Sequence, residues 1–300
     1  MLDIFTVHFY PQGGEYGNDV STAMQQRRNR STRALWDPNY TDETWIADKV
    51  KLIPRMKTWV NTYYPNTPIG ITEYNWGAEN HINGATAQAD IYGIFGREGL
   101  DYATRWTTPA SSTPTFKAMK MYRNYDGNKS TFGDLSVSSS GPNPDNISCF
   151  AARRSTDGAL TIMAINKQIG TNAPVRLSLA NFLPAGTAQV WQLTSANTIT
   201  RLSDVAFTGG SFSNTLPAQS VTLFVLPTGT PPQLRTSGLS SSNTLNGWLD
   251  GRAGERYAIL GSSNFVNWIP VQTNTLPSTS MPIALPATHA WRFFRAQWLP

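Results

Sequence analysis

The chain has 300 residues, of which only 14% are charged, and it contains ten tryptophans and eleven tyrosines. This composition suits a protein of sheets and long loops and is often seen in sugar-binding proteins. Much of the net charge of +5 lies in a short arginine run over residues 27–33, which lacks the helical or aromatic-stripe context that nucleic-acid binding needs. We expect these arginines to form internal ion pairs with Asp37, Asp42 and Glu43 instead. The single cysteine excludes an internal disulfide framework and a cysteine-based zinc site, and the sequence contains no transmembrane stretch.

The first 127 residues alternate between strand-like and helix-like segments. Strands are expected over residues 2–10, 68–76 and 101–108, and helices over residues 42–65, 84–98 and 113–127. A long loop is expected over residues 15–44. This order predicts part of a parallel (β/α)8 TIM barrel, with three strand-helix units, and three strands cannot close a barrel.

From about residue 128 the pattern changes to short strands and turns, such as the hairpin signal at Asp157 and Gly158. We predict an antiparallel β-sandwich over residues 128–228, a linker over residues 229–235, and a small all-β accessory module over residues 236–300.

The second expected strand ends in a carboxylate. Residues 68–71 are mostly apolar, and Glu73 follows them, with Tyr74, Asn75 and Trp76 next. An ionised glutamate resists burial unless it is paired, whereas at the C-terminal end of a barrel strand it projects into the site. From this segment alone, Glu73 is either a catalytic residue or a strand-end residue in an ordinary salt bridge.

The other strand ends carry residues that suit a sugar-binding cleft. His8 and Tyr10 share one face of the first strand because their spacing is two residues, and Trp106 ends the third strand. Indole faces pack against the apolar faces of sugars, so we expect Trp106 to contact substrate, with Trp36, Trp45 and Trp76 as candidates for neighbouring subsites. For these last three residues, core packing is an equally good interpretation.

Five segments together resemble the C-terminal part of glycoside hydrolase family 44. They are DIFTVHFYPQGGE (residues 3–15), RNRSTRALWD (28–37), ITEYNWG (71–77), ATRW (103–106) and LPAQSVTLF (216–224). The resemblance covers roughly residues 2–227 and leaves residues 236–300 outside it.

The resemblance implies a retaining endo-β-1,4-glucanase or xyloglucanase, with Glu73 as the nucleophile on the seventh barrel strand. His8, Tyr10, Tyr74, Asn75 and Trp106 would then face the substrate. It also implies an acid/base glutamate in an Asn-Glu pair on the fourth strand, and this sequence contains no such pair.

We therefore expect a truncated chain with little activity of its own. Glu15, Asp37 and Glu79 lie on loops that could border the cleft, but none matches the family pattern, and we do not expect them to replace the missing acid.

The expected partner is a β-1,4-glucan or xyloglucan polysaccharide, and we expect no nucleic acid, no membrane span, no cofactor and a secreted monomer. The family allows a structural calcium ion, but no ligand cluster is legible in this sequence. Two other interpretations remain open. The chain could be a non-catalytic carbohydrate-binding or surface protein, or a structural fragment without activity.

Overall fold

The computed structural model describes residues 2–182, 186–207, 210–229, 231–240, 243–287 and 293–299. The chain divides into two compact units. The first comprises residues 1–175, 188–205 and 213–226, and the second comprises residues 176–187, 206–212 and 227–300. The domain boundaries expected from the sequence stay predictions.

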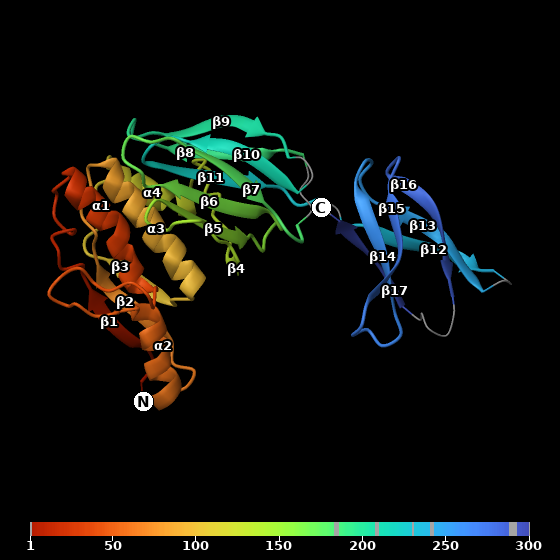
Figure 1. The fold of residues 1–300 in the computed structure, drawn as a ribbon, viewed down its shortest axis with the longest axis horizontal. Helices are drawn as coiled ribbons and strands as arrows, with labels where there is room; N and C mark the ends of the chain where they lie inside the picture. Colours follow the sequence, from red (N-terminus) through yellow and green to blue (C-terminus); the bar gives the residue numbers. More distant parts are fainter. Residues whose placement is uncertain are drawn as a thin grey trace. The chain divides into compact units, whose positions relative to one another are not determined.

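Three parallel strands form the sheet of the N-terminal part (Figure 1). They are β1 (Phe5–Phe9), β2 (Ile69–Tyr74) and β3 (Tyr102–Arg105), in the order β1-β2-β3. Among the described residues β1 and β3 each pair with β2 alone, so the sheet is open and forms no closed barrel. The parallel strands agree with the sequence analysis, and the TIM barrel itself is not confirmed.

Helices follow the strands. They are α1 (Thr22–Ser31), the 3-10 helix η1 (Thr32–Leu35), α2 (Leu52–Tyr63), α3 (Ile82–Glu98) and α4 (Pro114–Arg123). The predicted start of α4 is confirmed, because the Thr113 hydroxyl accepts a hydrogen bond from the backbone N–H of Phe116 (3.2 Å) and Pro114 follows the cap. None of the helices in the described ranges is long and apolar enough to cross a membrane.

The prediction of an uninterrupted loop over residues 15–44 is wrong, because α1 and η1 lie within it. The buried residues of α1 are all polar, namely Gln25, Arg28, Asn29 and Ser31. A helix is normally recognised in a sequence by an apolar stripe on its buried face. A helix that buries polar side chains gives no such signal.

The prediction that the next helix starts at Asp42 is also wrong, since α2 starts at Leu52. Asp42 instead forms a local turn, in which its Oδ1 accepts the backbone N–H of Thr44 (2.9 Å). Pro54 lies in the first turn of α2, where its missing N–H removes no helical hydrogen bond.

A six-stranded antiparallel sheet follows in the order β4-β5-β6-β11-β8-β9. Its strands are β4 (Leu135–Val137), β5 (Ile147–Arg153), β6 (Leu160–Asn166), β8 (Ala188–Leu193), β9 (Ile199–Val205) and β11 (Ser220–Leu226). Every residue of β6 and β11 is buried, and α3 packs on β5, β6 and β11. Strands β7 (Ala173–Ser178) and β10 (Ser211–Leu216) pair separately. The antiparallel pairing agrees with the sequence analysis, and the β-sandwich stays a prediction.

The C-terminal part contains two three-stranded antiparallel sheets. One has the order β12-β13-β16 and the other the order β15-β14-β17. The strands are β12 (Gln233–Leu239), β13 (Thr244–Asp250), β14 (Arg256–Ser262), β15 (Ile269–Thr275), β16 (Ser280–Pro286) and β17 (Phe293–Leu299). Both sheets contribute to one apolar core, which includes Leu249, Tyr257 and Trp298. The all-β prediction agrees with these strands, although β12 begins inside the segment expected to be a linker.

Candidate active site

Glu73 lies near the C-terminal end of β2, and the structure brings His8 and Tyr10 to it. The Tyr10 hydroxyl donates a hydrogen bond to Glu73 Oε2 (2.9 Å), and His8 Nδ1 lies 3.3 Å from the same oxygen. The register explains this meeting, because a shift after Val7 places His8 directly opposite Glu73. The structure thus brings these three residues together, and their roles at a catalytic site stay predictions.

The Tyr10 phenol acts as a hydrogen-bond donor at this site. Desolvation, together with the hydrogen bond and the charge of Glu73, raises the pKa of Tyr10 above its usual value. The phenol therefore remains protonated over the neutral range. The Tyr10 hydroxyl contacts only Oε2 of Glu73 and does not restrain the other carboxylate oxygen, Oε1.

Asn75 connects the ends of β2 and β3. Its amide Nδ2 donates to the carbonyl of Trp106 (2.6 Å), and its Oδ1 accepts from the backbone N–H of Gly77 (2.7 Å) and from Arg105 Nη2 (2.8 Å). With these contacts, the Asn75 amide fixes the chain around Trp106. The indole of Trp106 is 58% exposed and remains a candidate platform for a sugar ring.

Arg105 is a site residue that the sequence analysis missed. Its side chain is only 3% exposed, and Nη1 donates to Glu79 Oε1 (2.7 Å) while Nη2 holds Asn75. The available signal was its place in the segment 103–106, directly before Trp106 and at the end of a strand. An arginine at the end of a strand is as often part of an ordinary ion pair as part of an active site. The sequence alone therefore did not distinguish these two roles for Arg105.

Tyr74 and Trp76 lie in the core and not beside the substrate face. Tyr74 is buried, and its hydroxyl accepts from Gln88 Nε2 (3.0 Å), while burial raises its pKa well above the usual range. The indole N–H of Trp76 donates to the hydroxyl of Ser31 (3.0 Å), and the ring packs against Phe9. Tyr74 was expected to bind substrate, and its burial does not support that expectation. For Trp76, core packing was the alternative to a subsite, and the structure places the ring in the core.

The other two candidate tryptophans, Trp36 and Trp45, differ in how exposed their rings are. Trp36 is half-buried under the guanidinium of Arg97, whose Cζ lies 4.1 Å from the ring centroid. That face of the indole is therefore occupied by an intramolecular cation–π contact. Trp45 lies between η1 and α2 and is strongly exposed, so it stays a candidate.

The three loop carboxylates considered as substitutes for an acid are already held by other groups. Glu15 is buried and accepts the backbone N–H of Gly13 (2.7 Å). Asp37 pairs with Arg33 (2.8 Å), and Glu79 pairs with Arg105. Each of the three carboxylates is therefore already engaged by another group of the chain.

The arginine run is mainly structural, as expected, but one of its members acts differently from the prediction. Arg30 pairs with Glu43 (2.8 Å) as expected. Arg28 instead donates to backbone carbonyls, among them those of Glu15 (2.9 Å) and Trp76 (2.7 Å). It thereby fastens the loop after β1 to the end of β2. Burial lowers the pKa of Arg28.

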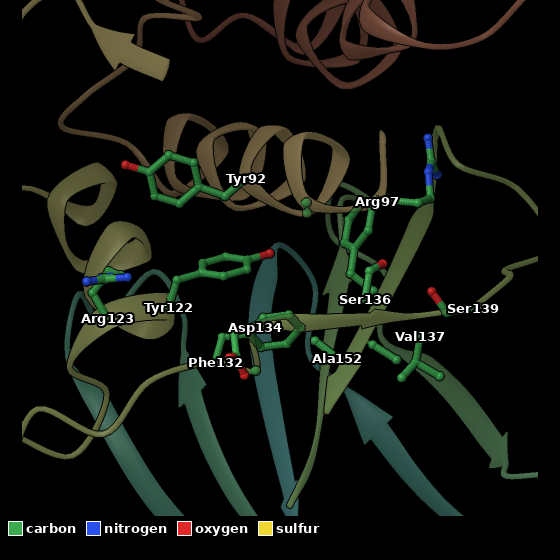
Figure 2. A pocket seen from close by; sticks show the side chains of 15 residues that line it. Tyr92, Arg97, Tyr122, Arg123, Phe132, Asp134, Ser136, Val137, Ser139 and Ala152 are labelled. Atoms are coloured by element: carbon green, nitrogen blue, oxygen red, sulfur yellow. The ribbon is translucent and has the colours of Figure 1, made fainter. Parts of the chain in front are cut away.

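A cavity lies apart from this site. It has a volume of about 450 Å³ and is lined by residues of α3, α4, β4 and β5, with Tyr92, Arg97, Tyr122 and Phe132 among its lining side chains (Figure 2). None of the residues around Glu73 lines it. Within the described residues, no three histidine, cysteine, aspartate or glutamate side chains are grouped so as to hold a metal ion.

Comparison with known proteins adds independent information. No protein-family model matches the sequence. The chain is 34% identical over 239 residues to endoglucanase A of Paenibacillus lautus, a match that covers 75% of this chain and 34% of that protein.

Two solved structures are similar to this chain. CelM2, a bifunctional glucanase-xylanase from a metagenome library, is 70% identical with a TM-score of 0.75, and the match covers 76% of this chain and 44% of CelM2. A xyloglucanase of glycoside hydrolase family 44 from Paenibacillus polymyxa, also solved with xyloglucan, is 32% identical with a TM-score of 0.71, covering 76% and 47% respectively. The chain thus spans less than half the length of these relatives.

Proposed function

Over about three quarters of its length the chain belongs to glycoside hydrolase family 44, and we propose that it carries the nucleophile of a retaining endo-β-1,4-glucanase or xyloglucanase. The observation that carries this proposal is the contact of Glu73 with Tyr10 and His8 at the C-terminal end of a parallel strand. In a TIM barrel, side chains at this end of the strands form the active site. We propose that β1, β2 and β3 are three strands of such a barrel.

In the proposed reaction, the ionised Glu73 carboxylate attacks the anomeric carbon of the sugar and forms a glycosyl ester, and the leaving oxygen takes a proton from a second carboxylic acid. Water then cleaves the ester, with the second group acting as the base. The Tyr10 hydroxyl orients the nucleophile by holding Oε2. Trp106 would support a glucosyl ring beside the bond that breaks.

The second carboxyl group has to lie about 5 to 5.5 Å from the nucleophile in a retaining enzyme. Glu15, Asp37 and Glu79 are each held by other groups, and the sequence contains no Asn-Glu pair. We propose that this acid belongs to a part of the barrel outside these 300 residues. Because the substrate is a polymer that cannot enter a cell, we also propose that the protein acts outside the cell.

Reducing-sugar release tests the proposal. The 300 residues alone should release little or no sugar from xyloglucan or carboxymethylcellulose, because the proton donor is missing. A fusion in which the N-terminal half of the Paenibacillus polymyxa enzyme precedes this chain should release sugar. Glu73→Gln should abolish that release, whereas Glu43→Gln, at a surface ion pair, should not. An active Glu73→Gln fusion would refute the proposed role of Glu73.

A further inference from the structure

The C-terminal part presents apolar side chains to solvent at the tip of one hairpin. Phe265 is 63% exposed and Val266 is 77% exposed, and Ile269 is also exposed. Phe265, Val266 and the half-buried Trp268 lie in the connection between β14 and β15, and Ile269 begins β15. We call these four residues the tip patch. Isolated exposed apolar residues are ordinary, but four neighbours on one hairpin tip indicate a contact surface.

The tip patch is held in a fixed conformation. Oδ1 of Asn264 accepts the backbone N–H groups of Val266 (3.0 Å) and Asn267 (2.9 Å). The indole N–H of Trp268 donates to the carbonyl of Phe265 (3.0 Å), and Phe265 has a positive φ of 61°. Because the backbone is fastened in this way, the exposed side chains are prearranged for a ligand and do not fold back onto the core.

The surroundings of the tip patch identify the chemistry of its ligand. One face of Phe265 stacks on Phe293, with ring centroids 3.6 Å apart, and Arg295 covers Trp268 at 4.4 Å. Phe265 also forms one wall of a cavity of about 330 Å³ whose polar lining includes Asn246 and Arg235. An aromatic face next to amide and guanidinium donors matches a molecule with apolar C–H faces and many hydroxyl groups.

The ligand is expected not to be cationic and to be small in contact area. The two acidic side chains of residues 227–300 are held elsewhere and leave no carboxylate for a cation, since Asp250 pairs with Arg235 and Glu255 accepts from the Trp298 indole (3.0 Å). A protein–protein interface takes roughly 20–30 residues from each partner, far more than the tip patch supplies. A few sugar rings of a polysaccharide chain fit the patch better.

We infer that the tip patch is a second glycan-binding site, which takes a neutral β-1,4-glucan chain and is separate from the Glu73 site. The sugar class rests on the proposed function. The aromatic platform and its fixed conformation stand without it.

Affinity electrophoresis of the full 300-residue chain tests this inference. The native protein should migrate more slowly in a gel that contains xyloglucan than in a gel without it. Phe265→Ala should weaken binding by about tenfold, since the loss of an aromatic anchor commonly costs this much. Val266→Ser should weaken it less and leaves the ring stack in place, and Phe265→Tyr should retain it. Tyr63→Ala, at an exposed aromatic residue of α2, is the matched control and should bind as the native chain does.

Several results would overturn the inference. These are an absence of retardation, equal retardation of native chain and Phe265→Ala with unchanged melting, or binding to phosphatidylglycerol vesicles and not to xyloglucan. Loss of binding in Trp106→Ala but not in Phe265→Ala would assign the binding to the other site. Sugar release by the fusion is measured in a separate experiment. If the fusion releases no sugar but the chain is still retarded in a Phe265-dependent way, the proposed function is rejected and the tip patch stands as a glycan-binding site.

Discussion

Glu73 and Tyr74 are neighbours on β2, yet Glu73 meets Tyr10 and His8 whereas Tyr74 is buried against Gln88. Successive side chains of a strand point to opposite faces, so a carboxylate on the substrate face requires its neighbour to face the helices. Trp76, two residues after the end of β2, is also buried and reaches Ser31 of α1. β2 therefore presents Glu73 on one face and buries Tyr74 on the other.

Removal of the Tyr10 hydroxyl should slow catalysis without unfolding the chain. Tyr10→Phe removes one hydrogen bond to a charged group, which is worth about 1.5–3 kcal/mol and corresponds to roughly 10- to 100-fold in rate. The measurement is kcat/KM of the fusion on xyloglucan. Tyr16→Phe, at an exposed position, is the control. An unchanged kcat/KM in Tyr10→Phe would show that the phenol does not act on Glu73.

His81 should make stability depend on pH. Its neutral Nδ1 accepts the backbone N–H of Asn83 (3.1 Å) at the start of α3, and desolvation, with a smaller contribution from Arg28, lowers its pKa below the ordinary value of about 6.5. The unfolded chain then binds the proton more readily than the folded chain. The stabilisation is therefore complete above about pH 6.5 and is lost as the pH falls through the lowered pKa.

Urea unfolding at a series of pH values measures this effect. His81→Asn keeps a side chain that can accept the same N–H group, so its stability should vary less between pH 7 and pH 5 than that of the native chain. Equal slopes for the two proteins would contradict this account of His81.

Helix α3 packs against strand β5 through a glycine. A Cβ atom on Gly93 would overlap the ring of Phe150, whereas nothing lies within 4 Å of a Cβ atom on Gly96, one turn later. Gly93→Ala should therefore destabilise the chain by about 1–3 kcal/mol, the usual effect of overpacking. Gly96→Ala should stabilise it by about 0.5–1 kcal/mol, because alanine favours the helix. Thermal melting compares them, and a tolerated Gly93→Ala would show that this contact is looser than described.

A buried ion pair joins α3 to the six-stranded sheet. Lys167 Nζ lies 2.9 Å from Asp90 Oδ2, which also accepts from the Thr32 hydroxyl (2.7 Å). Lys167→Met leaves the Asp90 carboxylate buried without its cation and should cost about 3–5 kcal/mol of unfolding free energy. Glu43→Gln, at the exposed pair with Arg30, should cost about 0–1 kcal/mol. Similar urea midpoints for the two variants would refute the structural role of the buried pair.

The sequence predicted those elements whose buried faces are apolar and those residues that end strands. Glu73 followed from its place at the end of an apolar strand, His8 and Tyr10 followed from their two-residue spacing, and α3 and α4 followed from apolar periodicity and the Thr113 cap. Helix α1 did not, because its buried residues are hydrogen-bonding side chains such as Arg28. Arg105 was missed because its role depends on contacts with Asn75 and Glu79, which lie 26 or more positions away in the chain.

At the scale of the whole molecule, the open parallel sheet lacks the cover that parallel sheets normally have. Strands of a parallel sheet are normally covered on both faces, yet three of the four residues of β3 are exposed. The solved relatives are about twice as long as their matched parts. Both facts support the proposal that further barrel strands complete this sheet and bring the acid to Glu73.

Covalent labelling of the fusion tests the role of Glu73 most directly. A 2-deoxy-2-fluoro-β-cellobioside with a dinitrophenyl leaving group needs no proton donor to react, so it should trap the glycosyl ester on the nucleophile. Peptide mass spectrometry should then find the sugar on Glu73, and Glu73→Gln should take up none while Glu43→Gln is labelled normally. A label on any other carboxylate, or a labelled Glu73→Gln protein, would contradict the assignment of Glu73 as the nucleophile.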